Sequence, residues 1–469
     1  MSKRFLISCM LVLALVTVAC GAATSTTPAT IAPQATQAPT AMPVMTATST
    51  TAPAAANDRL FVRDGYGTTT NGTTTNRLSV VDAQSGTRLQ DVPLGTPTTN
   101  WSVLYTTQWD AEQTIVRALD PLTGQTIRET SVSGRYTLPE TGIAGTFGGL
   151  SPNGTWLALE TKPGYVIDAT NTIQARSHLV VLDTAFAQAP KRVELGGNFA
   201  FDAVSNNGAS LYLIETLPRD STSTPGLGYK VRLYDVTTGV LHPGVVVDKT
   251  AIAQTMSGTR HSSVISADGQ WVYSLYLNQA KGPFIHMLNL DGRFAICVFL
   301  PTTGKEDFEK QLLWSLAQTK DGRSLYAVNG ALGIVADVDP AQLSVRRSMT
   351  IPTTTANRPT LVARVGTWLL PHASAKRILS GGAALTPDGR TLFIIAEQGL
   401  LAVNTADLTL RGRSLADWPL DSIAASPDGA RLYAVSAERG KLLLLDAATG
   451  RMVKEIGGAS RPWSVLGVE

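Results

Sequence analysis

The stretch SPDGARLYAV, from Ser426 to Val435, places a tight turn directly before a strand. Asp-Gly pairs favour the positive φ angles of tight turns, and the Leu, Tyr and Val residues that follow suit a half-buried strand. The same pattern occurs five more times, as SPNGTWLALE, SNNGASLYLI, SADGQWVYSL, TKDGRSLYAV and TPDGRTLFII, beginning at Ser151, Ser205, Ser266, Thr319 and Thr386. A pattern that recurs in this way predicts a repeat architecture.

The spacing of the copies indicates the size of the repeated unit. Successive turn glycines lie 54, 61, 53, 67 and 40 residues apart, and the shortest interval matches one four-stranded propeller blade. In the last unit, SIAAS, RLYAVSAE, KLLLLDAATG and RMVKEIGG follow one another as strands a, b, c and d. We therefore predict an all-β fold, a β-propeller of four-stranded blades.

The number of blades follows from counting strands b, c and d. Eight such sets begin near Arg59, Trp101, Thr155, Ala209, Gln270, Arg323, Arg390 and Ala430. The second set is irregular, because TTNWSVLYTTQ lacks a separable first strand and an Asp-Gly turn. Eight blades are predicted, and seven remain the alternative.

The two ends of the repeat region complement each other. RPWSVLGVE, at the C-terminus, resembles a strand a with no turn after it, and NDRLFVRDG, from Asn57, resembles a strand b with no strand a before it. Pairing the two completes one blade and removes exposed strand edges. We predict that the C-terminal strand closes the ring on the first blade.

A second short pattern ends strand c. VVDAQSG, ALDPLTG, LYDVTTG and LLDAATG each place an Asp four residues before a Gly. An Asp carboxylate at such a position accepts hydrogen bonds from backbone amides of the turn. We predict that these aspartates form turns and do not bind metal.

With this repeat the chain resembles the bacterial β-propellers with YVTN-type repeats, which are relatives of WD40 propellers. The resemblance spans residues 58–469 and rests on the PDG-x-x-LYV pattern. The WD40 signature itself is absent, since Trp109-Asp110 occurs once and out of phase. The resemblance implies a propeller but leaves the role open, because propellers of this family serve as binding platforms, scaffolds and, in some cases, lactone hydrolases.

The N-terminus has the features of an export signal. Lys3 and Arg4 precede an apolar run over residues 5–19, which is too short to span a bilayer comfortably. A basic segment followed by such a run is typical of a secretory signal peptide, which we assign to residues 1–19.

The signal ends in small residues before Cys20-Gly21, which resembles the lipobox of bacterial lipoproteins. That resemblance implies lipidation of Cys20 after cleavage, although Thr17 stands where the family usually has Leu. The alternative is an ordinary signal peptide, cut near Ala19 or Ala23.

Residues 20–57 separate the signal from the repeats and are almost entirely Thr, Ala, Pro and Ser, with no charged residue. Such a segment has too little apolar bulk to offset its ordering entropy, so we predict a disordered tether. The propeller, residues 58–469, would then be held at the cell-envelope membrane, outside the cytoplasm.

The net charge and the cysteine content limit the kinds of binding and disulfide partner that the protein could have. The formal net charge is +3, or +1 without Lys3 and Arg4, and no basic cluster is present, so nucleic acid is not an expected partner. Of the three cysteines, Cys9 leaves with the signal and lipidation would use Cys20. Cys297 then has no disulfide partner and is expected to be a buried small hydrophobe in a monomeric protein.

Loop lengths distinguish the two faces of the predicted ring. The a-b and c-d turns are short, whereas long insertions fall in b-c and d-a connections, which emerge on one face of an up-and-down blade. The insertions span residues 68–76, 162–177, 219–229, 249–260, 301–311 and 352–379. Variable insertions on one side of a repeat array usually mark its binding surface.

The mouth of the channel on that face can be located by counting back eight residues from each turn glycine. If strand a is innermost, these positions ring the opening: Thr146, Ala200, His261, Trp314, Gly381 and Asp421, with Trp463 added from the last strand. His261, Trp314, Asp421 and Trp463 could hold a small polar or sugar-like ligand by stacking and hydrogen bonding. Alternatively, the tryptophans plug the channel.

Catalytic patterns are scarce. The sequence has no HExxH, GxSxG or phosphate-binding glycine loop, and no metal or cofactor is predicted. His261 and His372 are better functional candidates than His286, which lies in the apolar strand FIHMLNL. We predict a binding or scaffold module for a protein or carbohydrate-like ligand. The alternatives are a lactonase-like hydrolase acting at the channel mouth and a propeller that helps to assemble an envelope complex.

Overall fold

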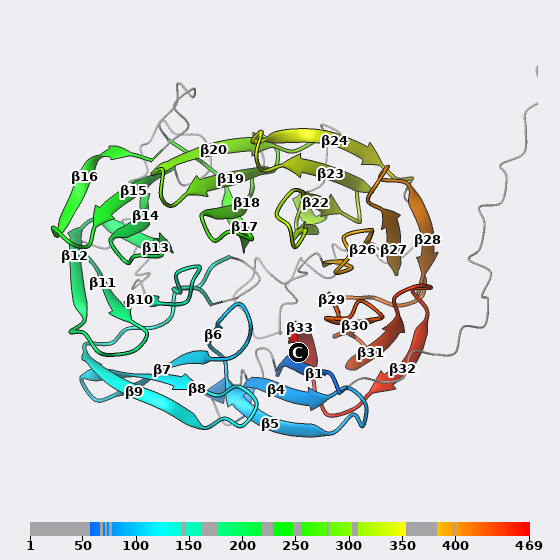
Figure 1. The fold of residues 1–469 in the computed structure, drawn as a ribbon, viewed down its shortest axis with the longest axis horizontal. Helices are drawn as coiled ribbons and strands as arrows, with labels where there is room; N and C mark the ends of the chain where they lie inside the picture. The colour runs from blue at the N-terminus through cyan, green and yellow to red at the C-terminus, as the bar shows by residue number, and fades with distance from the viewer. Residues whose placement is uncertain are drawn as a thin grey trace, which may run out of the picture. The chain divides into compact units, whose positions relative to one another are not determined.

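The computed structural model describes residues 57–65, 69–70, 73–74, 77–142, 147–161, 176–217, 228–246, 255–278, 281–302, 308–352, 382–397 and 399–469. The predicted signal peptide, Cys20 and the tether up to residue 56 lie outside the described residues. All described residues belong to one compact unit, Val44–Glu469. Within it, eight antiparallel sheets follow one another in a ring (Figure 1).

Each blade runs from an inner strand to an outer strand. Blade 1 contains β33 (Pro462–Val468), β1 (Arg59–Asp64), β4 (Arg77–Asp82) and β5 (Arg88–Pro93); blade 2 contains β6 (Thr96–Pro97), β7 (Leu104–Asp110), β8 (Gln113–Leu119) and β9 (Thr126–Ser133). Blade 3 contains β10 (Trp156–Glu160), β11 (Arg176–Asp183) and β12 (Lys191–Gly196); blade 4 contains β13 (Asn198–Val204), β14 (Ser210–Thr216), β15 (Tyr229–Asp235) and β16 (Val240–Val245).

The second half of the ring repeats this arrangement. Blade 5 contains β17 (Thr259–Ile265), β18 (Trp271–Leu277), β19 (Phe284–Asn289) and β20 (Phe294–Phe299); blade 6 contains β21 (Trp314–Gln318), β22 (Leu325–Asn329), β23 (Ile334–Asp339) and β24 (Ser344–Thr350). Blade 7 contains β25 (Ala383–Leu385), β26 (Thr391–Ile395), β27 (Leu400–Asn404) and β28 (Leu410–Ser414); blade 8 contains β29 (Ser422–Ala425), β30 (Arg431–Ser436), β31 (Lys441–Asp446) and β32 (Met452–Ile456). A small hairpin, β2 (Thr69–Thr70) and β3 (Thr73–Thr74), and one helix, α1 (Phe308–Gln311), complete the described elements.

The prediction of eight blades is confirmed, and blade 2 is less irregular than its sequence suggested. It has a separable first strand, the two-residue β6, so the expectation of none is wrong. Its turn is Thr98-Thr99-Asn100-Trp101, where the Trp101 amide bonds the Thr98 carbonyl as the turn glycine does in other blades. Trp101 adopts a φ of 58°, so a tryptophan occupies the left-handed position of the glycine. The sequence pattern missed this turn because non-glycine residues rarely occupy that conformation.

The repeated motif is a turn held by its own side chains. In blade 8 the Ser426 hydroxyl donates to Asp428 Oδ1 at 2.5 Å and accepts the Arg431 amide at 3.0 Å. The hydroxyl-to-Asp/Asn bond recurs at Ser151, Ser205, Ser266 and Thr386. The first and third residues of each copy therefore fix the hairpin between strands a and b.

The glycine of the motif also leaves space for the turn of a neighbouring blade. Gly429 has a φ of +73°, and a Cβ added to it would lie 2.7 Å from Pro387 Cδ in the turn of blade 7. Elsewhere in this ring of turns, the Asn206 side-chain amide donates to the Gly269 carbonyl at 3.1 Å. The chain repeats this motif because each turn both starts strand b and contacts the turn of a neighbouring blade.

The aspartates that end strand c form turns, as predicted. Asp235 Oδ1 accepts the amides of Thr237 and Thr238 at 2.8 and 2.9 Å, and Asp446 Oδ1 accepts the Thr449 amide at 2.8 Å. Among the described residues, no group of three or more His, Cys, Asp or Glu side chains could hold a metal ion.

The hydrophobic core is divided among the interfaces between blades. Eight large clusters of buried side chains lie one between each pair of neighbouring blades of the described structure. Leu60 of blade 1 packs with Tyr433 of blade 8, and Phe61 of blade 1 packs with Leu104 of blade 2. An open row of eight blades has seven interfaces, so the eighth cluster marks a closed ring.

Closure is achieved by the predicted pairing of the chain ends. β33 pairs antiparallel with β1, with Leu60 opposite Val468 and Phe61 opposite Gly467. The amides of Arg59 and Glu469 each donate to the other residue's carbonyl, at 2.7 and 3.0 Å. The last strand thus supplies the inner strand of the first blade, as the two sequence ends indicated.

Buried ion pairs reinforce the closure. Asp58 accepts from Arg431 Nε at 3.0 Å and from the Tyr433 hydroxyl, and it is 6% exposed. Asp64, which is fully buried, accepts the amides of Ser460 and Arg461 in the segment leading into β33. Charges this deeply buried need such partners, so these contacts fix the chain ends to each other.

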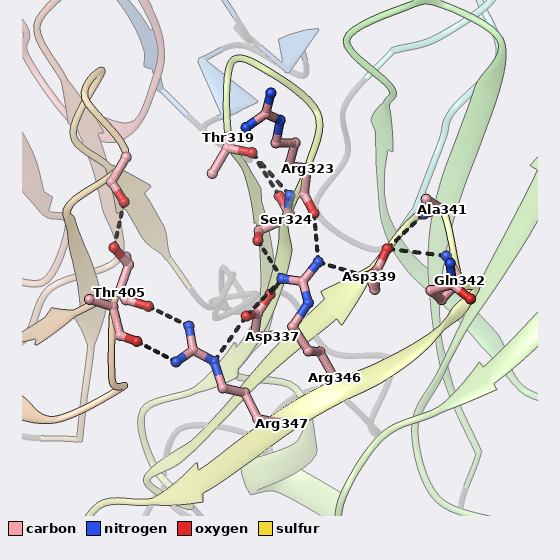
Figure 2. A network of polar contacts seen from close by, with 12 residues as sticks. Thr319, Arg323, Ser324, Asp337, Asp339, Ala341, Gln342, Arg346, Arg347 and Thr405 are labelled. Atoms are coloured by element: carbon pink, nitrogen blue, oxygen red, sulfur yellow. Dashed lines mark hydrogen bonds and ion pairs between the residues drawn. The ribbon is translucent and has the colours of Figure 1, made fainter.

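A related network joins blades 6 and 7 (Figure 2). The buried Asp337 lies between the guanidinium groups of Arg346 and Arg347, at 3.0 and 3.1 Å. Arg347 continues into blade 7, where it donates to the backbone carbonyls of Thr405 and Ala406. Asp337, Arg346 and Arg347 all have partners within the protein, so we interpret this network as a link between blades 6 and 7.

Gly429→Ala tests the contact between turns, with Gly440→Ala as its matched control. Both glycines are left-handed, with φ of +73° and +64°, but a Cβ at Gly440 would meet no atom within 4 Å. We expect Gly440→Ala to lower the free energy of unfolding by about 1 kcal/mol, from backbone strain alone. Gly429→Ala should cost about 2 to 3 kcal/mol, because it adds a clash with a proline ring. Equal losses in urea unfolding would show that the turns do not contact.

Candidate functional site

His261, the first of the predicted channel residues, lies in the inner strand of blade 5. It is the extra residue of a β-bulge, because its neighbours Arg260 and Ser262 pair with consecutive residues of β18. Its imidazole is 2% exposed and hydrogen-bonds the backbone of Trp314, and its Nδ1 atom has no hydrogen-bond partner among the described residues. Burial lowers the pKa of His261 to about 4, so the ring is neutral at physiological pH.

Trp314 begins the inner strand of blade 6. Its ring is 1% exposed and packs in the cluster between blades 5 and 6, with Leu275 and Leu300. Its indole Nε1 has no hydrogen-bond partner within the described structure. The structure therefore brings His261 and Trp314 into contact, with the indole in the core between two blades.

Asp421 and Trp463 lie on neighbouring inner strands, just before β29 and near the start of β33. The Asp421 carboxylate is buried and accepts the Ala437 amide at 2.7 Å. Trp463 is half-buried and, like His261, is a bulge residue, because Pro462 and Ser464 pair with consecutive residues of β1. The other predicted positions Thr146 and Gly381, and the candidate His372, lie outside the described residues.

His286 and Cys297 lie opposite each other on the outer strands of blade 5. His286 is buried, with Nδ1 3.7 Å from the Cys297 sulfur and its ring against Tyr276. Burial lowers the pKa of His286, which keeps the ring neutral in this aromatic cluster. Cys297 is half-buried.

Sequence reasoning missed a second set of polar residues in the channel. Asp202 is a bulge residue of β13, and its Oδ1 atom binds Arg260 Nη1 of β17 at 2.7 Å, with both side chains largely buried. Both residues belong to the lining of an open cavity of about 340 Å³, bordered by inner strands and a-b turns. A bulge interrupts the alternation of a strand, so no period-two pattern could have placed Asp202 in the channel.

Glu160 ends β10 beside this pair, between blades 3 and 4. Its Oε2 atom accepts the Phe201 amide at 2.8 Å. Burial raises the pKa of Glu160 to about 7, although the nearby charge of Arg260 opposes that shift. Glu160 is therefore a carboxyl group that changes its protonation state near neutral pH.

The comparisons with known proteins support the fold. No protein-family model and no curated protein matches the chain. Among solved structures, apo AztD from Citrobacter koseri is similar with a TM-score of 0.50 and 14% identity over 88% of this chain and 98% of AztD. The dihydro-heme d1 dehydrogenase NirN, in complex with DHE, has a TM-score of 0.48 and 14% identity over 88% of this chain and 75% of its own.

A third similar structure is a gluconolactonase. The periplasmic gluconolactonase PpgL from Pseudomonas aeruginosa has a TM-score of 0.36 and 16% identity over 78% of this chain and 97% of its own. At these identities the likeness to AztD shows a shared propeller fold, and none of the three comparisons assigns an activity to this chain. The YVTN repeat family likewise stays a prediction.

The raised pKa of Glu160 predicts a pH dependence of stability. The folded pKa of about 7 lies above the ordinary value of 4.5, so the stabilisation is complete below pH 4.5 and is lost as pH rises through 7. Between these pH values, we expect wild type to lose on the order of 3 kcal/mol of unfolding free energy relative to Glu160→Gln, whose amide oxygen can still accept the Phe201 amide. Urea unfolding at several pH values measures this.

Glu455→Gln, which removes an exposed carboxylate of a surface ion pair, is the control. The loss of unfolding free energy in this variant should be small, because an exposed ion pair contributes little. A difference between wild type and Glu160→Gln that does not change between pH 4.5 and 7 would contradict the assignment of a half-buried carboxyl group titrating near pH 7.

Proposed function

We propose that the chain is an exported, lipid-anchored β-propeller that binds a protein or carbohydrate-like ligand at the end of its channel where strands b and c are connected. The observation that carries this proposal is the pair of β-bulges in β17 and β33. Each lies near the start of an inner strand, and they displace His261 and Trp463 from the ladder. Bulges that re-aim side chains are over-represented next to functional sites.

The arrangement of the two faces of the ring also favours a binding site at this end of the channel. The a-b turns are short, as in the Ser426 to Gly429 turn, and contact one another across the blades. The strands that the long b-c and d-a insertions join end at the opposite face, where β17 and β33 begin. A half-buried tryptophan at that end offers an apolar ring with a polar N–H, a combination suited to sugars and to protein side chains.

Binding is favoured over the lactonase alternative by the distribution of carboxylates. A hydrolase that uses a metal or an activated water needs several carboxylates or amides converging on one point. Asp421 already accepts a backbone amide, and Asp202 is the one carboxylate among the described residues that line the channel cavity.

The anchor is supported by the sequence of the N-terminal region. The basic start, the apolar run and Cys20 fit a lipoprotein signal, and the uncharged segment after it fits a tether. Within the described residues, no helix has the length and apolarity needed to cross a membrane.

Site-specific photocrosslinking at Trp463 tests the binding site. We expect p-benzoylphenylalanine at position 463 to form adducts with a protein or glycan in intact cells, because the half-buried ring lies at the proposed contact. The matched control is Trp109, which is 49% exposed on β7, away from the channel, and should give none. Equal adducts at both positions, or none at 463, would contradict a site at this end.

Cys20→Ala tests the anchor. We expect wild type to pellet with membranes and to move into detergent, because a diacylglycerol chain adds about 0.8 kcal/mol of membrane affinity per buried CH₂. The variant should appear in the soluble fraction or keep its uncleaved signal. If wild type and variant fractionate alike as soluble species, lipidation is excluded.

A further inference from the structure

The outer strand of blade 5, β20, differs in composition from the outer strands of the other seven blades (Figure 1). An outer strand ends its sheet, so one side of its backbone faces away from the sheet and can pair with another chain. Six of the other seven outer strands carry charged residues, and the seventh, β16, contains Pro243. The strand β20 reads FAICVF and has neither a charge nor a proline.

The strand β20 also lacks the β-bulge that most outer strands have. The outer strand shifts its register against strand c in blades 1, 2, 4, 6, 7 and 8, whereas β19 and β20 pair without a shift. The other regular outer strand, β12, contains Lys191, Arg192 and Glu194. Charges, prolines and bulges protect exposed strand edges from pairing, so β20 is the outer strand of the described structure that has none of these protections.

The side of β20 that faces away from β19 has backbone groups in position for another strand. The Leu300 amide donates to the Pro283 carbonyl at 3.0 Å. In an antiparallel ladder the backbone groups of successive residues point alternately toward and away from the partner strand. The groups of Ala295 and Phe299 therefore point away from β19. Within the described part of the chain, β20 pairs with β19 alone, so this side can take a further strand.

A second copy of β20 matches this edge in register and in charge. Residues whose backbone groups point outward pair with one another, so an antiparallel pair with Cys297 on the two-fold axis places Ala295 opposite Phe299 of the second copy. A small side chain then faces a large one. Arg293, which precedes the strand, lies opposite Pro301 of the second copy, and no charged residue of β20 faces a like charge.

Phe299 gives the pairing a hydrophobic contribution. It is the most exposed large hydrophobic side chain of the described residues, at 54%. One side of its ring packs against Phe284, with ring centroids 5.6 Å apart. A second copy would cover the remaining surface of the ring, and burial of apolar surface favours association.

We propose that β20 is a self-association surface, through which two copies of the chain join blade 5 to blade 5 in one continuous antiparallel sheet. This inference goes beyond the proposed function, because β20 lies on the rim of the ring and the contact uses no residue of the channel. It replaces the monomer expected from the sequence. Each copy contributes about six residues, far fewer than the 20 to 30 of a standard interface, so the dimer is weak and forms in proportion to concentration.

Sedimentation velocity of the mature chain, residues 20–469 with Cys20→Ala, tests the dimer. We expect a monomer–dimer equilibrium in reducing buffer, with a Kd on the order of 10 to 100 µM. Phe299→Lys should weaken dimerisation at least tenfold, because it places a charge at the paired edge of each copy. Position 299 is exposed, so the variant should fold. Ile127→Lys, at a 49% exposed position on the outer strand β9, is the matched control and should leave the Kd unchanged.

Photocrosslinking tests the register. In the dimer, p-benzoylphenylalanine at position 299 should form adducts of twice the monomer mass, and peptide mapping should place the link near Ala295 of the second copy. Val453, which is 45% exposed on the outer strand β32, is the control position and should give no such adduct.

The outcomes separate this inference from the proposed function. A monomer at every concentration up to about 1 mM, or a Kd that Phe299→Lys does not change, overturns the dimer through β20 and leaves the Trp463 site standing. Links from position 299 that map outside residues 293–297 overturn the register. Adducts in intact cells with a different protein, and none with a second copy, assign the edge to another partner and also overturn the dimer. Trp463→Ala should leave the Kd unchanged; loss of dimerisation in that variant alone would place the contact at the channel mouth.

Discussion

The pairing of β33 with β1 is the constraint on which the rest of the structure depends. Every blade packs its hydrophobic faces against two neighbours, so blade 1 is stable only if blade 8 reaches it. The closing strand brings Leu60 and Val62 of blade 1 into one cluster with Tyr433 and Val435 of blade 8. The buried Asp58–Arg431 pair then joins two residues that are 373 positions apart in the sequence.

Closure also defines the two faces of the ring. Because the inner strands run side by side around the channel, their a-b turns meet on one face. The left-handed glycines of the Asp-Gly and Asn-Gly motifs allow these turns to contact one another closely. In the sequence, the long insertions fall in the b-c and d-a connections, on the side opposite to these turns. The bulges at Asp202, His261 and Trp463, all on inner strands, change the direction of side chains near the centre of the ring.

The fold could be predicted from the sequence because its determinants are local and repeated. Ser426, Asp428 and Gly429 define a turn within a few residues, and the two chain ends together showed the strands of one blade. Trp101 was missed as a turn residue because its left-handed backbone is rare for a side chain of its size. The position of Asp202 depends on a bulge and on Arg260, 58 residues away, and no local pattern encodes that pairing. The count of eight residues back from each turn glycine located His261 and Trp314 on inner strands. It could not show that the indole of Trp314 packs between two blades.

Native-state hydrogen exchange of the two chain ends tests the central claim most directly. If β33 closes the ring, the amides within residues 463–468 that bond β1 should exchange only through global unfolding, with the same free energy as those of the blade cores such as β31. Exchange of these amides at the rate of an unstructured terminus, while β31 stays protected, would show that the ring is open and would contradict the account.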